Sequence, residues 1–140
     1  AFGFVFQFSQ LVPELTVIDN VALPLLLNGV SRNKAYAEAK KWLEAVDLAD
    51  KHESTPGEIS GGQAQRVAIA RAMVVQPKIL FADEPTGSLD SLNSEHVMEL
   101  FIKTAKDNGT TVIMVTHEPS IAAYADREIV VRDGQIIGAK

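Results

Sequence analysis

The sequence contains no cysteine. A protein without cysteine has no disulfide framework and no thiolate metal site, and the absence fits a reducing compartment. Glycine and proline, at 9 and 6 among 140 residues, are too few for a low-complexity segment. Hydrophobic residues make up 46% of the chain, which is ordinary for one small globular domain.

Basic residues are not in excess, because 18 acidic residues outnumber 13 basic ones and give a formal net charge of −5. A nucleic-acid-binding domain usually presents a basic patch or stripe. The charge balance therefore argues against nucleic acid as a partner.

Long hydrophobic runs are also missing. The longest, residues 21–27, contains Pro24 and is far too short to cross a bilayer. Residues 1–6 lack the basic leader and the cleavage site of a secretory signal. Any membrane contact is therefore expected to come through a partner. The chain opens directly on a strand-like segment, and we interpret this abrupt start as a cut edge.

Two kinds of organisation follow each other along the chain. Residues 8–74 are expected to be helical, and the remainder alternates apolar strands with helices, as in a parallel-sheet α/β core. Strands are predicted over residues 3–6, 78–82 and 111–115. Helices are predicted over residues 17–27, 31–46, 60–74, 91–106 and 118–124, with a polar loop over 51–58. A hairpin is predicted around Asp133 and Gly134.

The strongest chemical signal is a pair of glycines at a predicted helix start, in the order Ser60, Gly61, Gly62, Gln63. Ser60 and Gln63 have the spacing of a capping box. The glycines allow the backbone to approach a ligand closely, and the free N–H groups and dipole of a helix start favour a phosphate. A capping box alone is a common structural feature, but the glycine pair and the long helix behind it favour an anion site.

Two adjacent carboxylates, Asp83 and Glu84, follow the strand predicted over residues 78–82. Ligands gather at the carboxyl ends of parallel strands. Because side chains alternate along a strand, the two carboxylates should point in different directions and take different roles. One can hold Mg²⁺ through water, and the other can orient or deprotonate an attacking water. An acidic turn is common after a strand, but its position directly after the Ser60 helix favours a site.

Three weaker signals accompany these. Residues 86–90, which include Ser88 and Asp90, form a turn and a helix cap in isolation. His117 follows the strand predicted over residues 111–115 and can contact a phosphate, whereas a lone histidine is more often structural. Gln7 follows the first strand and has almost no specificity by itself. His52 and His96 have no comparable placement and are interpreted as surface or packing residues.

The sequence resembles the nucleotide-binding domains of ABC transporters, and the resemblance covers the whole chain. It is carried by an ordered set of residues: Gln7, residues 60–63, the carboxylates at 83 and 84, Asp90 and His117. It implies an α/β, P-loop NTPase-like (RecA-like) core with a parallel sheet, truncated at the N-terminus, plus an ABC α-helical subdomain. Residues 8–74 correspond to the helical subdomain, and residues 1–7 and 75–140 to part of the core.

The resemblance also implies roles for the residues. Gln7 would touch Mg²⁺ and the attacking water and sense the transmembrane partner. Residues 60–63 would bind the γ-phosphate of ATP held mainly by the opposite subunit. Asp83 would be the carboxylate that faces the metal ion, and Glu84 would be the catalytic base.

Three further residues receive roles from the same resemblance. Ser88 and Asp90 would cross the interface of a head-to-tail dimer, and His117 would contact the γ-phosphate. Ile59 stands where the family more usually has leucine, a volume-conserving departure.

The phosphate loop of the family, G-x-x-x-x-G-K-[ST], occurs nowhere in this sequence, and neither does the aromatic that stacks on adenine. That loop cradles the β- and γ-phosphates and its hydroxyl holds Mg²⁺. The resemblance implies that the longer protein from which this chain was cut hydrolyses ATP. Because the chain itself lacks the phosphate loop, it is expected to be an inactive remnant when alone. It should associate with itself to cover an exposed sheet edge and apolar face.

Residues 4–7, 15–25 and 85–90 look like the subgroup that releases lipoproteins or exports macrolides or peptides. This implies a cytoplasmic subunit held on the inner face of the cell membrane by permease subunits, powering export or extraction. The alternative is a soluble ABC ATPase acting on nucleic acid or ribosomes. Against it count the compact segment between Gln7 and Ser60, which leaves no room for a coiled-coil insertion, and the lack of a basic arm.

Overall fold

The computed structural model describes residues 2–5, 9–127, 129–132 and 134–139. Its strands are β1 (Phe2–Val5), β2 (Ile79–Asp83), β3 (Thr111–Val115), β4 (Ile129–Arg132) and β5 (Gln135–Ala139). Its helices are α1 (Val17–Leu27), α2 (Arg32–Ala45), α3 (Gly61–Met73), α4 (Ser91–Asp107) and α5 (Pro119–Ala122), with a 3₁₀ turn η1 (Pro56–Glu58) before α3. No helix in the described part of the chain is long and apolar enough to cross a bilayer.

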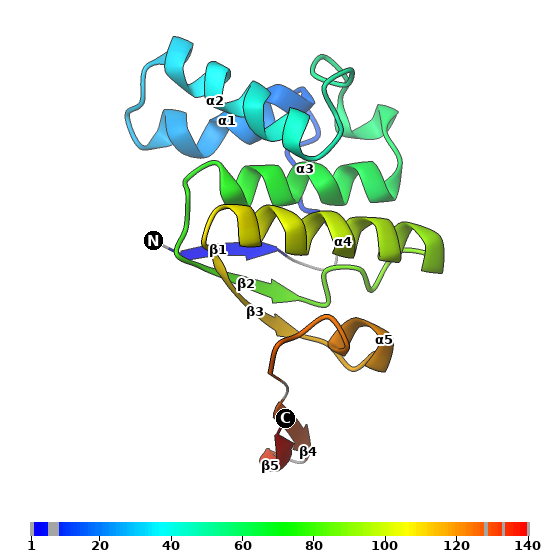
Figure 1. Ribbon diagram of the computed structural model, residues 1–140. Helices are drawn as coiled ribbons and strands as arrows, with labels where there is room; N and C mark the ends of the chain where they lie inside the picture. The colour runs from blue at the N-terminus through cyan, green and yellow to red at the C-terminus, as the bar shows by residue number, and fades with distance from the viewer. Residues whose placement is uncertain (1, 6–8, 128, 133, 140) are drawn as a thin grey trace.

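Strands β1, β2 and β3 form a three-stranded parallel sheet with β2 in the centre (Figure 1). Their register aligns Phe4, Phe81 and Ile113 in one row across the sheet. Parallel neighbours require crossover connections, which α1 to α3 supply between β1 and β2, and α4 between β2 and β3. The parallel α/β core expected from the sequence is confirmed.

Helix α3 is the central layer of the molecule. It packs against α1 and α2 on one side and against β1 and α4 on the other (Figure 1). This position explains why most of its residues are buried: Gly62, Gln65, Val67, Ala68, Ile69, Ala70, Ala72 and Met73. The strand beneath it comes so close that a Cβ on Gly3 would lie 2.7 Å from Cδ1 of Leu80 and 3.3 Å from the carbonyl oxygen of Ala72, so a side chain there would require its neighbours to shift.

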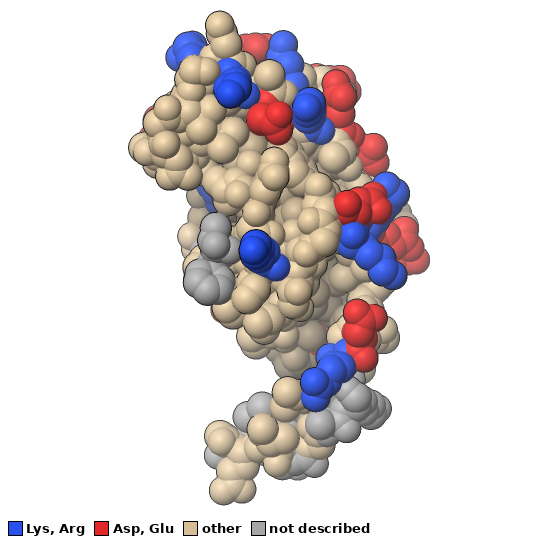
Figure 2. Space-filling view, turned by 60° about the vertical axis from the view of Figure 1, so that its left-hand side comes forward, with Lys and Arg blue, Asp and Glu red and all other residues tan. Residues whose placement is uncertain are grey.

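The opposite face of the sheet is open. Phe4, Ile113 and Val115 are 57%, 46% and 61% exposed, and the rings of Phe4 and Phe81 stack with centroids 5.5 Å apart. We refer to Phe4, Phe81, Ile113 and Val115 as the open sheet face. Parallel sheets are normally covered on both faces, so this surface is the unusual feature of the fold. On the side shown in Figure 2, basic and acidic side chains alternate along the rim and neither sign forms a continuous patch.

Local sequence accounts for most element ends. Thr16 caps α1 in a capping box with Asp19, at 3.3 and 3.4 Å, and the helix continues through Pro24 to Leu27. Ser31 stands at the start of α2 as expected but makes no capping hydrogen bond. The loop predicted over residues 51–58 contains η1 at its end, where the backbone N–H and the hydroxyl of Thr55 donate to Oε1 of Glu58 at 2.9 and 3.0 Å.

Candidate functional site

The predicted site residues that the structure describes lie on the side of the sheet where its strands end. Because α3 and α4 run back across parallel strands, both helices begin at the edge where the strands end (Figure 1). A Cβ added to Gly61 would lie 3.6 Å from Cδ2 of Leu89, and one added to Gly62 would lie 3.1 Å from Oδ1 of Asn93. The glycine pair therefore lies beside the segment that leads into α4 in the same chain.

The start of α3 has the geometry expected of an anion site. The backbone N–H of Gln63 donates to Oγ of Ser60 at 3.1 Å, and the backbone N–H of Ser60 donates to Oε1 of Gln63 at 2.9 Å, which completes the capping box. The N–H groups of Gly61 and Gly62 belong to the first turn and have no acceptor within the helix. Ser60 and Gly61 are exposed, so a phosphate from outside the chain can reach them.

Glu84 leaves the strand in a left-handed backbone conformation, with φ of 46°. Asp83 is the last residue of β2 and is exposed, whereas Glu84 is half-buried. The N–H of Glu84 donates to the carbonyl of Val115 at 2.8 Å, and its carbonyl accepts from the N–H of Gly87 at 3.0 Å. The direction of the Glu84 side chain is therefore set by this backbone turn. The strand alternation invoked from the sequence ends at Asp83.

A left-handed conformation costs a residue with a side chain about 1 kcal/mol. The two backbone hydrogen bonds hold Glu84 in it. Such locally strained residues cluster at functional sites, and the turn aims this carboxylate at the residue that follows the neighbouring strand.

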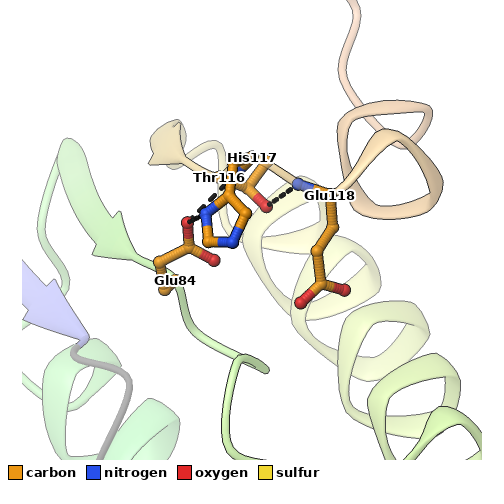
Figure 3. A network of polar contacts seen from close by, with 4 residues as sticks. All are labelled: Glu84, Thr116, His117 and Glu118. Carbon is orange, nitrogen blue, oxygen red and sulfur yellow. Dashed lines mark hydrogen bonds and ion pairs between the residues drawn. The ribbon is translucent and has the colours of Figure 1, made fainter.

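His117 meets that carboxylate directly (Figure 3). Oε1 of Glu84 accepts the backbone N–H of His117 at 3.1 Å and lies 2.6 Å from the ring Nδ1. The Glu84 side chain is 17% exposed and the His117 side chain 86% exposed. The backbone N–H of Glu118 donates to Oγ1 of Thr116, while the Glu118 side chain points away from the pair (Figure 3). Two residues expected to share one site are thus in contact across 33 positions of sequence.

Asp90 has a clear structural task in this chain. Its Oδ1 accepts the backbone N–H of Asn93 at 2.9 Å and its Oδ2 accepts Nδ2 of Asn93 at 3.1 Å, so it caps α4. These hydrogen bonds, the backbone one first, hold the pKa of Asp90 below its ordinary value. Ser88 lies on the exposed turn before the cap. The Oγ of Ser94 donates to the carbonyl of Thr86 at 3.2 Å and ties this turn to α4.

The other residues considered from the sequence lie elsewhere. Gln7 falls outside the described residues. His96 is exposed on α4, and His52 is half-buried in the loop before η1.

Sequence reasoning missed two polar residues of α3 that tie the site to the rest of the chain. Nε2 of the buried Gln65 donates to the carbonyl of Pro85, directly after Glu84. The guanidinium of Arg71 donates to the carbonyls of Ser9 and Gln10. A polar residue on the buried side of an amphipathic helix is a signal that could have identified Gln65. Nothing in the local pattern points to the partners of Arg71.

The carboxylates fit a weakly held divalent ion. Among the described residues, no group of three or more His, Cys, Asp or Glu side chains could hold a metal by itself. Mg²⁺ retains several waters and is commonly bound through one or two carboxylates together with substrate phosphates. Asp83 and Glu84 are two adjacent carboxylates of this kind at the end of β2, and Asp83 is exposed.

Comparison with known proteins decides the family. The family model described as ABC transporter matches residues 1–87. The chain belongs to the ABC transporter family. Over 134 residues it is 45% identical to the lipoprotein-releasing system ATP-binding protein LolD of Bordetella pertussis, covering 96% of this chain and 58% of that protein. It is 48% identical to the uncharacterized ABC transporter ATP-binding protein YknY of Bacillus subtilis, covering 98% and 59%.

Solved structures of ABC cassettes agree with the fold. The dimeric post-hydrolysis state of the ATP-binding cassette MJ0796, bound to ADP and Pi, superposes with a TM-score of 0.84 at 38% identity, covering 99% of this chain and 62% of that one. A second dimeric structure of MJ0796 gives 0.83 at 39% identity. The chain thus spans about three fifths of the length of the relatives and structures it matches.

Proposed function

We propose that the protein carrying this sequence hydrolyses ATP as the cassette subunit of a membrane transporter of the lipoprotein-release type. One observation carries the proposal: Glu84, held by His117, and the glycine-flanked start of α3 share the edge where the parallel strands end. The likeness to LolD and to a cassette solved with ADP and Pi supports it.

In this proposal the acidic residues have separate tasks. Glu84 accepts a proton from the attacking water, and Asp83 holds Mg²⁺ through water. His117 contacts the γ-phosphate and positions the Glu84 carboxylate through Oε1. Gln7 contributes to the metal and senses the transmembrane partner. Bound Mg²⁺ would neutralise charge developing on the phosphate oxygens.

The start of α3 is proposed to serve the nucleotide of a second copy arranged head to tail. Ser60 and Gly61 are exposed and Gln63 is half-buried, whereas Gly62 is buried. The free N–H groups of the first turn suit the γ-phosphate held mainly by the opposite subunit. Ser88 and Asp90 would line the interface between the copies. The cassette would be held on the inner face of the cell membrane by permease subunits and would power export or extraction.

This sequence contains no phosphate loop. Without the backbone amides and the lysine of that loop, the β- and γ-phosphates lack their main cradle. We therefore propose that the 140-residue chain by itself neither binds nor hydrolyses ATP.

The test replaces the proposed base in the full-length gene product. Glu84→Gln should lower kcat at least about a hundredfold, because general-base catalysis contributes on that order. The same variant should accumulate an ATP-bound dimer on size-exclusion chromatography. Glu118→Gln is the matched control, since this neighbouring carboxylate points away from His117 (Figure 3), and its kcat should stay within about twofold of the wild-type value. If the Glu84→Gln protein hydrolysed ATP at the wild-type rate, Glu84 would not be the general base. In the same assay, the 140-residue chain alone should show no turnover.

A further inference from the structure

Residues 9–16 connect the position of Gln7 to α1 without regular secondary structure except a turn, yet side chains from two helices hold them. Asn20 of α1 is fully buried, and its Oδ1 accepts the N–H of Val12 at 2.8 Å while its Nδ2 donates to the carbonyl of Val12 at 3.1 Å. The same Nδ2 lies 3.0 Å from the carbonyl of Thr16. This end of the segment is therefore fastened to α1.

The other end is fastened to α3 by Arg71. Its Nη2 donates to the carbonyl of Ser9 at 2.9 Å, and its Nη1 donates to the carbonyl of Gln10 at 3.1 Å. Gln10 adopts a left-handed conformation with φ of 52°, which L residues rarely adopt. Two separate guanidinium nitrogens reach the two carbonyls, a fixed geometry that the single, shorter ammonium of lysine does not reproduce.

The guanidinium of Arg71 is half-buried, and burial lowers its pKa. Among the described residues no carboxylate forms an ion pair with it, so the two backbone carbonyls are its anchors. A partly desolvated cation held by carbonyl dipoles has a strong requirement for both contacts. The segment and the last turns of α3 should therefore move together.

We propose that Arg71 is a positioning residue that makes α3 and residues 9–16 move together. A phosphate that binds at Gly61 and Gly62 would then change the conformation or mobility of residues 9–16, the segment next to Gln7 in the sequence. The helix has a second attachment at Gln65, which donates to the carbonyl of Pro85 beside Glu84. Helix α3 would thus connect three parts of the ATPase machinery. The inference rests on the proposed function, because it assigns a route between two of its parts.

The test measures hydrogen exchange in the full-length gene product carrying Glu84→Gln, with and without Mg-ATP. In this background, ATP should alter exchange both at the start of α3 and in residues 9–16. Adding Arg71→Gln should preserve the response at the start of α3 and remove at least about three quarters of it in residues 9–16. Arg71→Lys, which keeps the charge but loses the two-nitrogen geometry of the guanidinium, should retain an intermediate response in residues 9–16.

Arg66→Gln is the matched control. Arg66 lies on the same helix, is half-buried, and donates from Nη1 to the carbonyl of Val46 at 3.0 Å, away from residues 9–16. Its replacement removes a similar contact and should leave both responses in place.

The outcomes separate the two proposals. Failure of the protein with Arg71 intact to respond to ATP anywhere would defeat the proposed function. A normal response at both segments in the Arg71→Gln and Arg71→Lys proteins would overturn this inference alone. An ATP response confined to α3 while Arg71 is intact would also overturn it. Should Arg71→Gln fail to fold, the lysine variant decides, since full exchange responses in it would refute the requirement for the guanidinium of Arg71.

Discussion

Gly61 and Gly62 occupy adjacent positions in the first turn of α3 but meet different surroundings. A Cβ on Gly62 would press on the side chain of Asn93, which is itself bonded to Asp90. A Cβ on Gly61 would meet only Cδ2 of Leu89, at an ordinary contact distance of 3.6 Å. Packing therefore explains glycine at position 62 but not at position 61, where the proposed approach of a phosphate gives a testable reason for it.

Replacing Gly61 by alanine should separate stability from activity. The free energy of unfolding of the full-length protein should stay the same or rise by up to about 1 kcal/mol, because alanine favours helix over glycine. ATP hydrolysis should fall at least about tenfold, since the methyl group keeps a phosphate from the backbone N–H groups. Urea unfolding and steady-state hydrolysis measure the two effects.

Gly57→Ala serves as its control. Gly57 is exposed in η1 and a Cβ there would meet nothing within 4 Å, so hydrolysis should be unchanged. Normal ATPase activity in the Gly61→Ala protein would show that no ligand needs this glycine.

Helices α1 and α2 are joined by a polar contact as well as by packing. The hydroxyl of Tyr36 on α2 donates to Oδ1 of Asp19 in the first turn of α1. This hydrogen bond is the main reason that the pKa of Asp19 lies below its ordinary value of 3.8, with contacts to Thr16 adding to the effect and burial opposing it. A lowered carboxyl pKa means that the ionised form stabilises the fold. That contribution is present above about pH 4 and is lost as the pH falls through the lowered pKa.

Tyr36→Phe should reduce the free energy of unfolding by about 1 kcal/mol at pH 7, the usual net value of one hydrogen bond. The difference from wild type should shrink as the pH falls below the ordinary carboxyl value of 3.8. Urea unfolding of the full-length protein at pH 7, 5 and 3.5 tests this. Tyr124→Phe is the control, because burial is the main cause of the raised pKa of Tyr124, and it should not change the acid dependence. If the difference in unfolding free energy between Tyr36→Phe and wild type did not change with pH, the ionised Asp19 would not be the group that the Tyr36 hydroxyl stabilises.

The molecule as a whole has helices on one face of its sheet and an apolar surface on the other. The open sheet face presents aromatic and β-branched side chains to solvent, although such faces are normally buried. An exposed surface of this kind favours association. Figure 1 also places the β4–β5 hairpin apart from the three-stranded sheet, at the end of the molecule.

The isolated 140-residue chain should therefore associate with itself, and its average mass by light scattering should rise with concentration. Ile113→Lys and Val115→Lys should lower that mass, because each puts a charge on the open sheet face. Leu92→Lys is the control, since Leu92 is 79% exposed on α4 and outside this face. A clean monomer at all concentrations would contradict the expectation.

Local interactions explain why much of the fold could be predicted. The capping boxes at Thr16 and Ser60 join residues three positions apart, and the strand over residues 111–115 is set by its own β-branched side chains. Gly134 adopts a positive φ at the chain reversal where the hairpin was predicted. The family resemblance rested on such short segments, and the match to the ABC transporter family confirms it.

Other features depend on contacts that no short segment contains. The carboxylate of Glu84 finds His117 at a separation of 33 residues, and Arg71 finds Ser9 at a separation of 62. The left-handed turn at Glu84 exists because β3 supplies the carbonyl of Val115 to its N–H group. The sequence by itself thus determines which chemical groups are available and where the helices begin, because these features depend on residues a few positions apart. Which side chains meet, and which sheet face stays open, follows only from the packing of strands and helices that are distant in the chain.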